Sequence, residues 1–69
     1  MRHQPRGALT LEISSEGASW RATARCLRSA REHVLILKRT GWRRISVEVI
    51  DSTGNVVAYH DPNTGAWRT

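Results

Sequence analysis

The chain has 69 residues and a formal net charge of +5, from 11 basic and six acidic side chains. A chain this short buries only about 60% of its unfolded surface, which excludes a second domain and predicts a thin core. A single cysteine excludes an internal disulfide and favours the reducing cytoplasm. The longest apolar run is Val34–Leu37, so we expect neither a signal peptide nor a membrane span.

The amino-terminal third begins with a patternless segment and continues as a strand. Residues 1–7 contain Pro5 and Gly7 without periodicity, and we expect a disordered basic tail there. The segment ALTLEIS then alternates apolar and polar residues, which predicts a strand with one solvated face. The following SSEGAS is typical of a turn.

The stretch SWRATARCL, residues 19–27, fits two periods. Its neighbours favour a strand from Trp20 to Leu27 that pairs with the preceding strand, because Ser29 and Glu32 have the spacing of a capping box that would start a helix afterwards. Gly41 stands where a left-handed residue ends helices, and Ala30, Val34 and Leu37 would form the buried stripe of that helix. Two alternatives remain, a single helix over residues 19–40 and a strand at HVLIL.

The carboxyl-terminal third predicts a hairpin. RRISVEVI alternates and VVAYH follows DSTGN, in which Gly54 supplies the positive φ of a short loop. HDPNTG then turns the chain away, and residues 63–69 are expected to form a loosely ordered tail after a single domain over residues 8–62. The predicted fold class is therefore α+β, a small antiparallel sheet with one helix packed on one face, in the order ββαββ, with βαββ and βαβββ as alternatives.

The residues that could carry chemistry are scattered. His3, His33 and His60 lack the closely spaced partners of a zinc site, and His60 and Asp61 would point to opposite faces of a strand. The alternation of residues 20–26 places Cys26 on the apolar face, where we expect it to act as a small buried hydrophobe. We therefore expect a protein that is not an enzyme and uses no metal or other cofactor.

Positive charge is concentrated before residue 45. Residues 1–44 hold ten basic and three acidic side chains, whereas residues 45–69 hold one basic and three acidic. Such a basic region attracts phosphates or an acidic partner. The candidate nucleic-acid-binding residues are Arg21, Arg25, Arg28, Arg43 and Arg44. Contacts to phosphate alone would bind DNA or RNA without reading its sequence.

Two functional hypotheses follow. The first is a small intracellular, non-catalytic interaction module that acts as a homodimer, a larger homo-oligomer or a protein adaptor, since a thin core and an unprotected outer strand of the hairpin both favour association. The alternative is a nucleic-acid-binding or regulatory protein that contacts phosphates through the basic patch.

Overall fold

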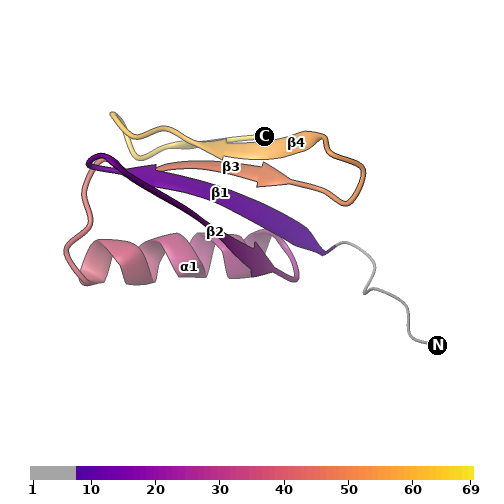
Figure 1. Cartoon of the computed structure of the whole chain (residues 1–69), viewed down its shortest axis with the longest axis horizontal. Coiled ribbons are helices and arrows are strands. Elements are labelled where there is room, and N and C mark those ends of the chain that lie inside the picture. The colour runs from indigo at the N-terminus through magenta and orange to yellow at the C-terminus, as the bar shows by residue number, and fades with distance from the viewer. Residues whose placement is uncertain (1–7) are drawn as a thin grey trace.

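The computed structural model describes residues 8–69, which form one helix and a five-stranded antiparallel sheet (Figure 1). The expected tail at residues 1–7 lies outside the described residues. In chain order the elements are β1 (Leu9–Ser15), β2 (Ala18–Ala24), α1 (Leu27–Arg39), β3 (Ser46–Ile50), β4 (Val56–His60) and β5 (Trp67–Arg68). The strands lie in the order β2-β1-β3-β4-β5. No helix within residues 8–69 is long and apolar enough to cross a membrane.

This arrangement confirms the α+β class and corrects the predicted element order. The chain runs ββαβββ rather than ββαββ, and the alternatives with a helix at residues 19–26 or a strand at HVLIL are wrong. The added strand is β5, which falls within the segment expected to be a tail and pairs with β4 through Tyr59–Arg68 and His60–Trp67. The two-residue strand is too short to show a period of two, so the sequence does not reveal it.

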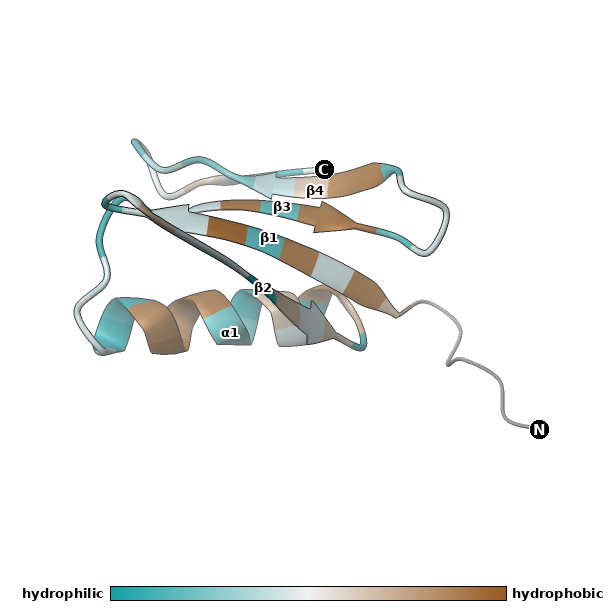
Figure 2. Ribbon diagram, in the orientation of Figure 1, coloured by the Kyte–Doolittle hydropathy of each residue, from teal (hydrophilic) through white to brown (hydrophobic). Residues whose placement is uncertain are grey.

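The first hairpin explains why residues 18–24 are a strand. Glu16 and Gly17 both have positive φ, 51° and 86°, which is the geometry of the tight turn whose twist matches antiparallel strands. Ser15 and Ala18 flank this turn as partners, and the register continues to Leu9–Ala24. Apolar and polar residues alternate along β1 (Figure 2), with every second side chain buried. The turn therefore aligns two alternating segments before a helix can form in the second.

The start of α1 differs from the predicted capping box. The helix begins at Leu27 with Cys26 as its N-cap, and the Ala30 N–H donates to the Cys26 carbonyl at 3.0 Å. Starting there adds Leu27, which packs partly buried on the core, to the apolar stripe of the helix. Burial of this side chain outweighs the cap that Ser29 could supply. Cys26 is consequently exposed, so the expectation of a buried cysteine is wrong.

The end of α1 follows the prediction. Gly41 has a φ of 102°, and its N–H donates to the Lys38 carbonyl while the Trp42 N–H donates to the Leu37 carbonyl. These paired bonds satisfy carbonyls that the helix leaves free, and they define a Schellman motif. Glycine is needed at this position because a side chain strains a positive φ. The motif redirects the chain toward β3.

The core lies between the sheet and α1. The buried apolar side chains are Leu9, Leu11, Ile13, Ala30, Val34, Ile45, Val47, Val49 and Ala58. Leu11, Val47 and Val49 are fully inaccessible, which places the centre of the core on β1 and β3. The predicted helical stripe is confirmed in Ala30 and Val34, with Leu37 partly buried. One sheet face is thus covered by α1 and the other is open.

The second hairpin is confirmed. β3 and β4 pair from Val47–His60 to Ile50–Val56, with an irregularity at Val49/Ile50. In the connecting loop Gly54 has a φ of 92°, as expected, and Asp51 Oδ1 accepts hydrogen bonds from the N–H and hydroxyl of Thr53 and from the Asn55 N–H. The loop is therefore closed by a side chain as well as by backbone bonds.

Candidate interaction surfaces

The outer edge of β2 is the longest free strand edge among the described residues. β2 is the terminal strand of the sheet and has seven residues, all paired with β1 on one side only. At the opposite margin β5 covers the Tyr59–His60 end of β4, so the outer strand of the second hairpin, which we expected to be open, is partly protected. Edge strands of this length invite pairing with another chain unless charge, proline or a bulge blocks them.

The tight turn fixes which backbone groups of β2 are free. Ser15 and Ala18 close the two-residue turn as a hydrogen-bonded pair, and bonded and non-bonded pairs alternate from there along an antiparallel ladder. The even-numbered residues of β2 therefore bond to β1. The N–H and C=O groups of Ser19, Arg21 and Thr23 point away from the sheet, and these side chains are exposed.

The five arginines expected to form one patch are distributed over three places. Arg25 and Arg28 lie where β2 passes into α1, whereas Arg43 and Arg44 precede β3 at the other end of the sheet, where Ser46 pairs with Ser14. Arg21 lies between them on the open sheet face, and its Nε is 2.7 Å from Glu12 Oε2. All five side chains are exposed, but the fold does not bring them together.

The outer side of α1 carries a denser basic surface. Arg28, Arg31, Lys38 and Arg39 are all exposed on the helix, and Glu32 is the single acidic residue of that element. Exposed Leu35 and Ile36 lie among them. Three of these cations were missed because the sequence could not show which residues of α1 face away from the sheet. Helical periodicity around Ala30 and Val34 is the signal that could have identified them.

The open sheet face has little net charge. One row of partners crosses all five strands, in the order Arg21, Glu12, Glu48, Tyr59 and Arg68. Its two arginines offset its two glutamates. The three tryptophans are partly buried on the helix side: Trp20 packs on Trp42 at 4.8 Å between ring centroids, and Trp67 meets His60 edge-on at 5.0 Å. Tyr59 is thus the sole aromatic residue on this face, which is poor for stacking nucleic-acid bases.

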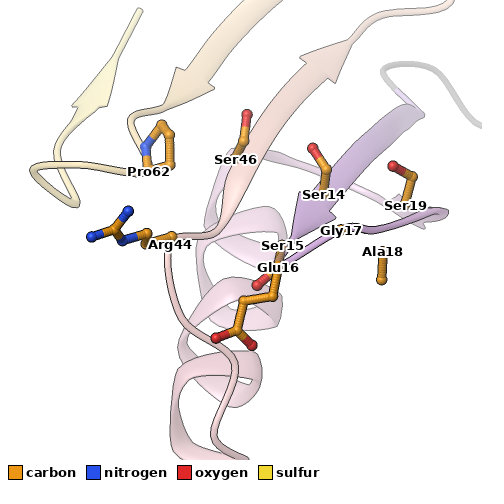
Figure 3. A pocket seen from close by; sticks show the side chains of 9 residues that line it. All are labelled: Ser14, Ser15, Glu16, Gly17, Ala18, Ser19, Arg44, Ser46 and Pro62. Carbon is orange, nitrogen blue, oxygen red and sulfur yellow. The ribbon is translucent and has the colours of Figure 1, made fainter.

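A shallow hollow of about 310 Å³ lies at the turn end of the sheet (Figure 3). The hydroxyls of Ser14, Ser19 and Ser46 lie on one side of the ribbon in this view, while the Arg44 guanidinium and the Glu16 carboxylate point elsewhere. A ligand site requires polar groups that converge on one point. These groups diverge, so the hollow offers no defined geometry for binding or catalysis.

His60 serves a structural role that the sequence does not reveal. It is 1% exposed at the end of β4, and its Nδ1 lies 2.7 Å from the Ile45 carbonyl oxygen, which identifies Nδ1–H as the donor. This bond ties the entry of β3 to β4. Nε2 is buried without a partner, and the neighbouring Trp67 ring encloses it on one side.

The remaining reactive side chains stand apart from one another. Backbone and side-chain hydrogen bonds from Ser29 lower the pKa of the exposed Cys26 thiol, with Ser29 Oγ at 3.6 Å from the sulfur. Within residues 8–69 no group of three His, Cys, Asp or Glu residues is placed to hold a metal ion.

The geometry therefore defines a small α+β domain with two surfaces suited to association, the β2 edge and the basic outer side of α1. Comparison with protein-family models, curated proteins and solved structures finds no match to the chain.

Proposed function

We propose that this protein is a small, cytoplasmic, non-catalytic interaction module that associates by strand addition at the outer edge of β2, with a second copy of itself as the first partner. The observation that carries the proposal is the seven-residue edge, which has no proline, no bulge and a single charged side chain. Pairing along such an edge satisfies backbone groups that otherwise bond only to water.

The small size of the core supports self-association. Nine apolar residues form the buried cluster of the described residues, and β2 contributes none of them, since Trp20, Ala22 and Ala24 are only partly buried. A second chain at this edge would cover these side chains further. Small domains commonly gain stability in this way.

The test is the molar mass of the protein by size-exclusion chromatography with light scattering, from micromolar to near-millimolar concentration. We expect a dimer that dissociates on dilution. Thr23→Pro should shift the equilibrium to monomer, because it removes an N–H that points away from β1 and leaves the β1–β2 ladder intact. Thr23→Val, which keeps the N–H, is the matched control. A strict monomer at the highest concentration would overturn the self-associating form of the module.

A second candidate function is supported by the basic surface of α1. Binding to phosphates through Arg28, Arg31 and Arg39 would give affinity for DNA or RNA that falls steeply with salt. The test is binding to single- and double-stranded nucleic acid at low and physiological salt. Alanine at these three positions should lower the log–log salt slope by about 1 per lost phosphate contact, whereas Arg21→Ala, which removes a cation already paired with Glu12, is the control. No binding at low salt would exclude this function.

A further inference from the structure

We infer that two copies pair through antiparallel β2 strands about a two-fold axis at Ala22, so that Arg21 of each copy lies opposite the partner's Thr23. The inference rests on the proposed self-association and specifies its geometry. The result would be a continuous ten-stranded sheet with both α1 helices on the same face, because a two-fold axis perpendicular to a sheet keeps its faces on the same sides.

The pleat limits the possible registers. Side chains that share a sheet face must stay on that face across the new pair, so the register can change only in steps that preserve the alternation of exposed and half-buried residues along β2. The free N–H and C=O groups at Ser19, Arg21 and Thr23 must also meet their equivalents. The axis can then pass through Trp20, Arg21, Ala22 or Thr23.

Charge and size select among these registers. An axis at Arg21 sets the two guanidinium groups directly opposite each other, and an axis at Thr23 sets Arg21 opposite the partner's Arg25, and like charges in these positions are destabilising. An axis at Trp20 sets two bulky indoles at the close approach of a non-hydrogen-bonded pair. An axis at Ala22 instead pairs Arg21 with the partner's Thr23 and each indole with a partner alanine. It is the register without a steric or charge conflict.

The flank of α1 next to this edge is compatible with a second helix. The Arg31 guanidinium carbon lies 6.0 Å from the centroid of the Trp67 ring, and the Lys38 Nζ lies near Gly65, so that flank of α1 faces β5. At about 3.6 residues per turn the opposite flank is Ser29, His33, Ile36 and Thr40. It faces past β2, which Figure 1 shows beside α1.

This opposite flank differs from the rest of the exposed helix surface. It carries no Lys, Arg, Asp or Glu, and its spacing of four, three and four residues is that of a seam between two packed helices. Ile36 is 57% exposed in the single chain. The middle of α1 lies opposite Ala22, since α1 runs back along β2 from the Arg25–Cys26 connection. An axis at Ala22 therefore brings Ile36 toward the partner's Ser29 and covers an apolar side chain.

Disulfide trapping tests the register at exposed positions. In a Cys26→Ser background, Arg21→Cys and Thr23→Cys chains are oxidised separately and as an equimolar mixture. We expect a covalent dimer containing one chain of each kind from the mixture, and little dimer from either variant alone, because identical positions would be diagonal neighbours about 7–8 Å apart, beyond normal disulfide reach. Self-linked Arg21→Cys dimers would instead place the axis at Arg21 and overturn the inference.

A charge exchange tests the same contact without cross-linking. Thr23→Arg sets a like charge opposite each Arg21, and Thr23→Glu sets an opposite charge there; both are exposed and unbranched, so their effects on the fold of one chain are matched. We expect dimer dissociation constants that change in opposite directions, each by about fivefold for the two symmetric pairs. Equal shifts would overturn the inference. A dimer that gives neither result refutes the register alone, whereas a wild-type monomer refutes the proposed function.

Discussion

Replacing Leu11 with alanine tests whether the centre of the core lies on β1. Leu11 is 0% exposed, and its backbone pairs with Ala22 on one side and Val49 on the other. Leucine-to-alanine changes at sealed sites cost about 3–5 kcal/mol, from lost burial and from the cavity that remains. The surrounding strands cannot collapse easily onto such a cavity, because β1 is bonded on both edges.

The matched control is Leu35→Ala, the same chemical change on the outer side of α1. Leu35 is 49% exposed, and alanine is the better helix former, so we expect a cost below about 1 kcal/mol. The free energy of unfolding of a domain this size is on the order of 4–10 kcal/mol, so Leu11→Ala should remove a third or more of it.

Urea unfolding followed by tryptophan fluorescence measures both variants, at one protein concentration because self-association would add stability. The three tryptophans pack against the core and should report its loss. A lower midpoint with an unchanged slope for Leu11→Ala, well below that of Leu35→Ala, is the expected result. Equal midpoints for the two variants would refute the placement of Leu11 at the centre of the core.

Three further predictions concern the loops and the helix ends. Hydrogen bonds from Thr53 lower the pKa of the Asp51 carboxyl, so its ionised form stabilises the fold above the ordinary pKa, and this is lost as pH falls through the lowered value. Asp51→Asn should flatten the acid limb of the urea midpoint against pH; an unchanged limb would contradict this. Cys26 should react with thiol reagents at lower pH in the folded than in the urea-unfolded chain, because Ser29 lowers its pKa, and superimposable rate profiles would disprove it. Gly41→Ala should cost about 1–2 kcal/mol of unfolding free energy from the backbone alone, since nothing lies within 4 Å of an added Cβ. A variant as stable as the wild type would show that the Schellman turn is not required.

The hairpins and the helical stripe were predictable because their signals are local. Alternation along β1 and β3, Gly54 in a hairpin loop and Gly41 after the helix each depend on residues within a few positions of one another. The start of α1 was predicted two residues too late, since a good local cap at Ser29 competes with burial of Leu27, which depends on distant strands. The same competition left Cys26 at the exposed N-cap.

The candidate surfaces were harder to predict. The five arginines are close in sequence, but the β2–α1 connection and the entry to β3 lie at opposite ends of the sheet. Which strand edge is free depends on β1 pairing with both β2 and β3, and on β5 returning to β4. Neither pairing has a signature in a single segment.

The sequence by itself therefore determined the class of the fold, the two hairpins, the apolar face of α1 and the excess of positive charge. Each of these follows from short-range periodicity, turn chemistry or composition. The tertiary structure alone decided that the β2 edge is open, that His60 is buried against the Ile45 carbonyl, and that the basic side chains gather on the outer side of α1. These features depend on which strands become neighbours, and contacts between residues far apart in the chain are set by the packing of the whole core.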